Sequence, residues 1–175
     1  TLAGIRGASG TATWACSNNT VGGSVSNSLN NTSAANTSWV DGIFNSSFAG
    51  TFNNNTISNL TAAGGASPGT YSVVGIVNTA STNNNTVSQN TIYNLTNTNG
   101  SASTDVIGIS FTGSSGANTI ERNFIHSLSN ASSDNTASTS GIYANGGTVR
   151  YFNNIVSISA ASFGASVYGI YDNAG

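Results

Sequence analysis

The chain has 175 residues and a mass of 17.5 kDa, which is the size of one domain with its own core. Charged residues make up only 5% of it, against about 25% in an average globular domain, and the formal net charge is −2. Three arginines and no lysine argue against a nucleic-acid partner, and no apolar run approaches the roughly 18 residues of a membrane span.

A Gly-Ile dipeptide recurs along the whole chain. Its glycines are Gly4, Gly42, Gly75, Gly108, Gly141 and Gly169. The three central intervals are each 33 residues, and the segments 49–60, 84–95 and 117–128 match position by position. A fixed period of this length indicates a repeat protein, so we expect residues 1–175 to form a single domain whose coils start near these glycines.

The predicted elements within each repeat are short strands. Residues 73–77 and 91–95 alternate apolar and polar side chains and are rich in β-branched residues, whereas a helical repeat would need an apolar period of 3.6. Long loops of Asn, Ser, Thr, Gly and Ala follow at 61–71, 96–105 and 129–140. The predicted fold class is all-β: a parallel β-helix (β-solenoid) of five to six coils of about 33 residues, with three short strands per coil.

Equivalent residues of successive coils form columns, because strands in a solenoid stack about 4.8 Å apart. Two inward columns are predicted to form the structural core: Ile43, Ile76, Ile109, Ile142 and Ile170, and Ile57, Ile92 and Ile125. The glycine column is expected to mark a corner that requires positive φ or a close backbone approach.

One polar column is predicted to be a buried structural ladder. It contains Asn55, Asn90, Asn123 and Asn153, with Ser24 at the equivalent position of the irregular first coil. Asparagine tolerates left-handed backbone geometry at a turn, and its amide can bond the neighbours above and below.

This pattern of Gly-Ile dipeptides and Asn-Thr-Ile segments resembles the parallel β-helix repeats of large secreted or cell-surface bacterial proteins, particularly of Bacteroidetes-like lineages. The resemblance extends from Leu2 to about Tyr171. It implies a right-handed solenoid and an extracellular or cell-surface location. It implies no particular activity, because the shared residues occupy core and turn positions.

The sequence offers little for catalysis, so no enzyme activity, catalytic residue, metal site or cofactor is predicted. The carboxylates fall in different columns, whereas glycoside hydrolysis needs two at a defined separation. They are Asp41, Asp105, Glu121, Asp134 and Asp172. Glu121 and Arg122 are expected to point to opposite faces of a strand, and His126 lacks the further ligands of a metal site. A polysaccharide lyase or glycoside hydrolase remains the weaker alternative.

Cysteine and aromatic residues each allow two interpretations. Cys16 is solitary and is expected to pack as a small buried residue beside Trp14, although pairing between chains is the alternative. The column after Gly-Ile contains Arg6, Phe44, Val77, Ser110, Tyr143 and Tyr171. Its aromatic members either form an exposed surface that binds sugars or a partner protein, or are covered by the long loops.

The two ends of the sequence carry no capping helix and no charged edge. We therefore expect either continuation in a longer chain or end-to-end self-association into a filament. The predicted function is an extracellular structural or adhesive solenoid that acts as a rigid spacer or stacking subunit, with surface glycans as possible partners. A carbohydrate-binding domain is the alternative.

Overall fold

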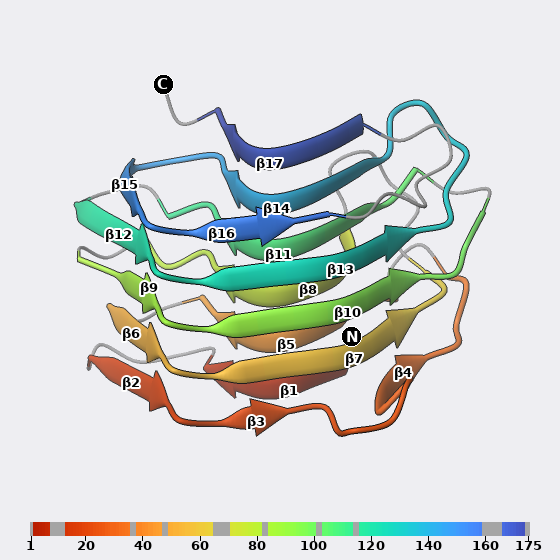
Figure 1. Cartoon of the computed structure of the whole chain (residues 1–175), viewed down its shortest axis with the longest axis horizontal. Helices are drawn as coiled ribbons and strands as arrows, with labels where there is room; N and C mark the ends of the chain where they lie inside the picture. Colours follow the sequence, from red (N-terminus) through yellow and green to blue (C-terminus); the bar gives the residue numbers. More distant parts are fainter. Residues whose placement is uncertain are drawn as a thin grey trace.

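The computed structural model describes residues 2–7, 13–35, 38–46, 49–64, 71–81, 84–100, 103–113, 116–158 and 166–173. These residues form a parallel β-solenoid, in which the chain winds through three sheets and returns one level higher on each turn (Figure 1). All pairings between neighbouring strands are parallel, and the described residues contain no helix. The predicted fold class is confirmed.

Each sheet stacks strands from successive levels. Sheet A has six strands: β1 (Leu2–Gly7), β5 (Val40–Asn45), β8 (Tyr71–Asn78), β11 (Asp105–Phe111), β14 (Ser138–Ala144) and β17 (Ser166–Asp172). Sheet B has five: β2 (Trp14–Ser17), β6 (Gly50–Asn53), β9 (Thr86–Ser88), β12 (Ala117–Glu121) and β15 (Thr148–Phe152). Sheet C contains β3 (Thr20–Val21), β7 (Thr56–Ala62), β10 (Thr91–Asn97), β13 (Phe124–Asn130) and β16 (Ile155–Ser157), and β4 (Leu29–Asn31) also pairs with β7.

The register reproduces the columns read from the repeat. In sheet A, Ile76 pairs with Ile43 on one side and Ile109 on the other, and in sheet C, Ile92 lies between Ile57 and Ile125. The four coils from β5 to β16 are complete. The level below them is irregular and the level above is represented by β17 alone, so the complete coils are slightly fewer than the five to six expected.

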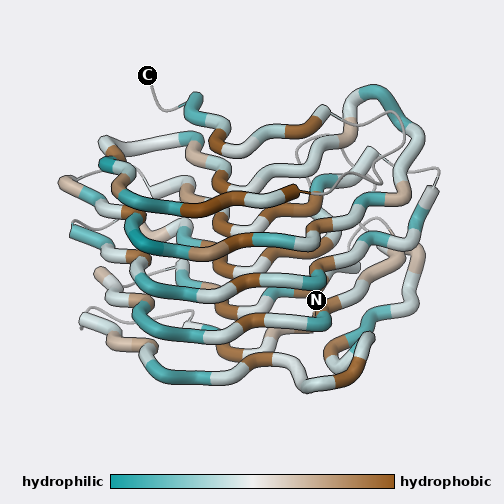
Figure 2. The backbone as a smooth tube through the Cα atoms, viewed as in Figure 1, coloured by the Kyte–Doolittle hydropathy of each residue, from teal (hydrophilic) through white to brown (hydrophobic). Residues whose placement is uncertain are grey.

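The core is a set of apolar columns that run through the stack (Figure 2). Seven of the eight predicted core isoleucines are fully buried: Ile43, Ile57, Ile76, Ile92, Ile109, Ile125 and Ile142. Ile170 is the exception, with 46% of its surface exposed. It lies on β17, above which no described strand packs, so it is covered from one side only.

The glycine column lies inside the strands of sheet A, where each strand bends. Val106 and Ile109 both face the core although they are three positions apart, which a straight strand would not allow. None of the column's glycines has a positive φ. A Cβ at Gly108 would lie 2.5 Å from the Gly141 carbonyl oxygen and 2.6 Å from Cγ2 of Ile125. Glycine is therefore required here by close approach.

Candidate functional site

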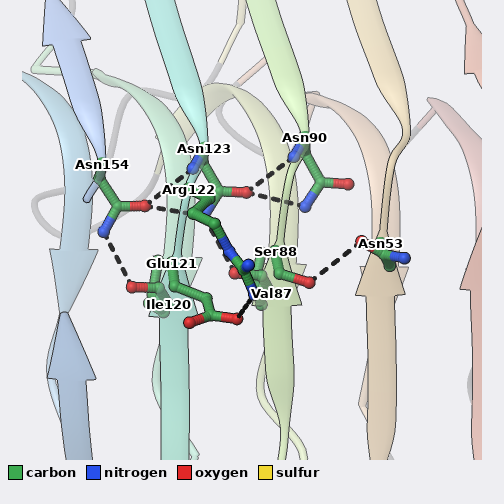
Figure 3. A network of polar contacts seen from close by, with 9 residues as sticks. All are labelled: Asn53, Val87, Ser88, Asn90, Ile120, Glu121, Arg122, Asn123 and Asn154. Atoms are coloured by element: carbon green, nitrogen blue, oxygen red, sulfur yellow. Dashed lines mark hydrogen bonds and ion pairs between the residues drawn. The ribbon is translucent and has the colours of Figure 1, made fainter. Parts of the chain in front are cut away.

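A buried ladder of asparagine amides runs along the corner between sheets B and C (Figure 3). At each step the Oδ1 atom of one asparagine accepts two hydrogen bonds from the asparagine one coil below. Asn90 thus receives the backbone N–H of Asn55 at 3.0 Å and its Nδ2 at 2.9 Å. Nδ2 of Asn90 also donates to the Phe52 carbonyl at 2.9 Å. Each internal amide therefore has all its donors and acceptors in use.

The ladder has five members: Asn19, Asn55, Asn90, Asn123 and Asn154. Asn123 donates from its backbone N–H and its Nδ2 to Oδ1 of Asn154, at 3.1 and 2.9 Å. The prediction of Asn153 is therefore wrong by one position. In the first coil the ladder residue is Asn19, whose Nδ2 lies 2.9 Å from Oδ1 of Asn55, and not Ser24.

The error has a backbone cause. The residue before each ladder position adopts the left-handed conformation, with φ between 50 and 60°: Asn18, Asn54, Gln89, Arg122 and Asn153. The ladder residues themselves have no positive φ. The left-handed turn and the buried amide therefore belong to adjacent residues, and Asn153 occupies the turn. The same shift places Val156, not Ile155, above Ile125, which leaves Ile155 61% exposed.

Three further amide pairs connect coils elsewhere in the molecule. In each, Nδ2 of one asparagine donates to Oδ1 of an asparagine 33 residues later: Asn45 to Asn78 at 3.1 Å, Asn85 to Asn118 at 3.1 Å, and Asn97 to Asn130 at 2.8 Å. Sequence analysis missed these pairs. The signal that would have found them is the same 33-residue interval, applied to every asparagine.

The carboxylates among the described residues belong to different strands and to one loop. Glu121 forms an ion pair with Arg122, contrary to the prediction that they face opposite ways. Because Arg122 has a φ of 53°, it lies in a turn, and the alternation of a strand does not apply to it. Asp172 accepts a hydrogen bond from Tyr151 at 3.0 Å, and Asp134 accepts two from Thr136. Within the described ranges, no three His, Cys, Asp or Glu side chains gather into a group suited to a metal ion.

Asp41 is a fully buried acid on the outer face of sheet A. Its Oδ2 accepts a hydrogen bond from Nε1 of Trp39 at 3.2 Å, but its Oδ1 has no partner. Burial raises the pKa of Asp41 to about 7, although the Trp39 hydrogen bond and the charge of Arg6 act in the opposite direction. Asp41 therefore changes charge near neutral pH.

A pocket lined by three tyrosines and one carboxylate lies farther along the same outer face. It has a volume of about 180 Å³, and we call it the tyrosine pocket; its lining includes Asp105, Ser138, Ser140, Tyr143, Tyr168 and Tyr171. The rings of Tyr143 and Tyr171 stack at 5.5 Å and 2°, and the ring of Tyr168 lies 4.9 Å from Tyr171 at 58°. The tyrosine rings at this end of the aromatic column therefore form an accessible surface.

Nearer the middle of sheet A the same column is covered. Val77 is fully buried and packs with Val74 and Ile107 in a second apolar cluster outside the solenoid core. Phe44 is half-buried, and the Arg6 guanidinium lies 4.5 Å from its ring centroid. The column is therefore buried near the middle of sheet A and accessible at its end, and the binding of sugars there stays a prediction.

A polar groove of about 410 Å³ lies on the outer face of sheet C. Asn59, Asn94, Thr96 and Ser129 are among its lining residues, and no charged side chain lines it. Nδ2 of Asn94 donates to Oδ1 of Asn59 at 3.1 Å. The left-handed φ of Asn59 and Asn94 bends the strands at this point, so that the groove runs across successive coils.

The remaining residues considered in the sequence analysis pack against other side chains. Cys16 is 4% exposed and lies in the core, as expected, and burial raises the pKa of its thiol. Trp14 packs edge-on against Phe52, with ring centroids 5.4 Å apart. His126 is half-buried and stacks on Tyr93 at 5.1 Å and 3°.

No helix long and apolar enough to cross a membrane occurs in the described part of the chain. Comparisons of the chain with models of protein families, with curated proteins and with solved structures found no match.

Proposed function

We propose that this chain is a rigid structural solenoid, exposed outside the cell, that spaces or presents contact surfaces and has no catalytic activity. The observation that carries the proposal is the asparagine ladder, which joins five successive levels. Bending the solenoid would require these hydrogen bonds and the parallel strand pairs to open together. The location is supported by the resemblance to repeats of secreted and cell-surface proteins of Bacteroidetes-like bacteria.

Rigidity is tested by the distance between two spin labels on one column. Ala15 and Arg150 are exposed residues of sheet B, four levels apart through Thr51, Thr86 and Thr119. At about 4.8 Å per level their backbones lie roughly 19 Å apart. In a Cys16→Ala background, labels on Ala15→Cys and Arg150→Cys should give one narrow distance distribution. A broad distribution, like that of the same protein in urea, would contradict a rigid spacer.

The location is tested separately, by labelling intact source cells with an antibody to this chain. We expect surface labelling that is lost when the cells are treated with protease. Labelling that appears only after the cells are permeabilised would remove the extracellular part of the proposal and leave the structural part standing.

The absence of catalysis rests on the separation of the carboxylates. Asp41 is buried, and Glu121 is paired with Arg122. We expect no release of reducing ends or unsaturated products from neutral or acidic polysaccharides. Turnover that disappears when Asp41, Asp105, Glu121 and Asp134 are all replaced by alanine would establish the enzymatic alternative.

End-to-end association is a second candidate, favoured by apolar side chains on the outermost described strands. Leu2 is 37% exposed, Val167 43% and Ile170 46%. A further coil would cover them, whether it came from a longer chain or from another copy. Negative-stain electron microscopy distinguishes the two: stacked copies would give fibres with a repeat of roughly 29 Å, at about 4.8 Å per level, whereas isolated short rods would contradict stacking.

A further inference from the structure

We infer that the tyrosine pocket binds an uncharged sugar residue. This inference does not depend on the proposed structural function, because a pocket on the outer face of sheet A is compatible with a solenoid of any role. It rests on three observations: an acceptor held in place, a buried hydroxyl without a partner, and an aromatic lining without positive charge.

Asp105 supplies the positioned acceptor. Its Oδ1 receives hydrogen bonds from the backbone N–H of Ser138 at 2.8 Å and from the Ser138 hydroxyl at 2.7 Å. These two bonds from the next coil fix the carboxylate at the rim of the pocket and leave Oδ2 free to accept others. A fixed carboxylate oxygen is a strong acceptor for the hydroxyl group of a ligand.

Ser140 supplies an unsatisfied group at the same place. Its side chain is fully buried and lines the pocket, yet its hydroxyl makes no hydrogen bond. A buried polar group without a partner destabilises the fold, so such groups are rare unless water or a ligand completes them. In strand register Ser140 lies beside Tyr168, which places a phenol next to it one coil above.

The lining distinguishes between ligand classes. None of the chain's arginines lines the pocket, so a uronate or sulfated sugar would find no cation there. The Tyr143 and Tyr171 rings are stacked on each other, so the opposed faces are unavailable to an organic cation, which binds over a ring face. What the pocket offers is hydroxyl groups, phenol rings and one carboxylate, and an uncharged polyol complements that set.

The size of the pocket suits a single sugar ring of a longer glycan. Its volume is about 180 Å³, and a neighbouring hollow of about 130 Å³ shares Asp105 and Tyr143 with it. Two adjoining hollows with a common carboxylate would accommodate consecutive residues of a chain.

The experiment is ligand-detected saturation-transfer NMR on the whole protein. The probes are glucose, galactose, mannose, xylose, N-acetylglucosamine and their common disaccharides at millimolar concentration, with galacturonate and choline as charged comparisons. At least one uncharged sugar should show transfer. Asp105→Asn and Tyr168→Ala should each weaken its binding about tenfold or more, which corresponds to about 1.4 kcal/mol.

The matched control is Asn94→Ala, an exposed residue of the polar groove on sheet C, which should leave binding unchanged. Melting curves confirm that each variant is folded; if Asp105→Asn is not, Tyr168→Phe, which removes one hydroxyl, takes its place. The inference is overturned if no uncharged sugar shows transfer, if galacturonate or choline binds more tightly than every uncharged sugar, or if only Asn94→Ala abolishes binding.

Discussion

Asn90 connects three coils through its side-chain amide and its backbone N–H. It accepts two hydrogen bonds from Asn55 below, donates two to Asn123 above and donates one to the Phe52 carbonyl. Asn90→Ala would remove the acceptor of the Asn55 backbone N–H and of one Nδ2 proton of Asn55, as well as the Nδ2 donor to the Phe52 carbonyl, in a buried place. We expect the free energy of unfolding in urea to fall by about 1–3 kcal/mol.

The control for that substitution is Asn30→Ala on β4, which removes an exposed amide at a residue without a positive φ. It should change the free energy of unfolding by about 0.5 kcal/mol or less, as surface substitutions usually do. Equal unfolding midpoints for Asn90→Ala and the unaltered protein would mean that the ladder does not stabilise the fold.

Asp41 predicts a dependence of stability on pH. Its pKa is raised by burial to about 7 in the folded protein, above its ordinary value, so its contribution to stability is complete below about pH 4 and is lost as the pH rises through 7. The free energy of unfolding should therefore decline by a few kcal/mol between pH 4 and pH 7.

Asp41→Asn, which resembles the protonated acid in shape and charge, should remove most of that decline in urea denaturation series at several pH values. A smaller decline should remain because burial also raises the pKa of Asp105. Identical pH profiles for the two proteins would show that Asp41 is not the group responsible.

For single residues, the sequence predicted that a buried asparagine ladder exists, but it did not identify all of the ladder's members correctly. Asn55, Asn90 and Asn123 were correctly identified because they are separated by 35 and 33 residues and lie in matching segments. The next interval is 31 residues, and two consecutive asparagines stand there, so spacing alone did not separate Asn153 from Asn154. Only the backbone conformation distinguishes the turn residue from the buried one.

Among the strands, the glycine column gives a sharp test of close packing. Gly108→Ala would place a Cβ 2.5 Å from the Gly141 carbonyl oxygen, and because that atom belongs to the backbone, a strand would have to move. We expect a loss of about 1–3 kcal/mol in the free energy of unfolding.

Gly169→Ala is the matched control in the same column. A Cβ at Gly169 would meet no atom within 4 Å, since Gly169 lies on the outermost strand of sheet A. This substitution should be close to neutral in thermal melts. Equal losses for Gly108→Ala and Gly169→Ala would contradict the requirement for close approach and point instead to the backbone preferences of glycine.

The strands themselves were predictable because each apolar column repeats at nearly the same interval in every coil. What the repeat did not reveal was the local geometry between strands. The Gly108 column was expected at a corner and lies inside bent strands, and the Glu121–Arg122 pair was missed because Arg122 leaves the strand conformation. Both features depend on backbone angles that single side-chain types do not specify.

For the whole molecule, the register predicts that one coil can be removed. Val74 pairs with Ile107, and Gly75 and Gly108 occupy the next position of the repeat. Deletion of residues 75–107 therefore joins equivalent positions and should yield a folded, shorter protein with the same circular dichroism per residue. Deletion of 75–106 shifts every following strand by one residue and should prevent cooperative folding.

The tyrosine pocket could not be predicted from the sequence. Asp105, Ser140 and Tyr168 come from three coils. Ser140 and Tyr168 share one column with Ile107, but the residue type changes at every coil and Asp105 lies in another column, so no repeated pattern connects them. Their proximity arises only when β11, β14 and β17 are stacked. Repetition in the sequence predicts the scaffold, whereas the features that distinguish one coil from another depend on departures from the repeat.

The continuous pairing of Gly75 with Gly108 and Gly141 also bears on how such a chain changes over generations. Unequal crossing-over between gene segments that encode equivalent coils would add or remove about 33 codons at once, and every junction would still join matching positions. The length of the protein would then vary in steps of about 4.8 Å without a new fold being required. Natural selection could thus change the length of the solenoid independently of the surface residues of each coil.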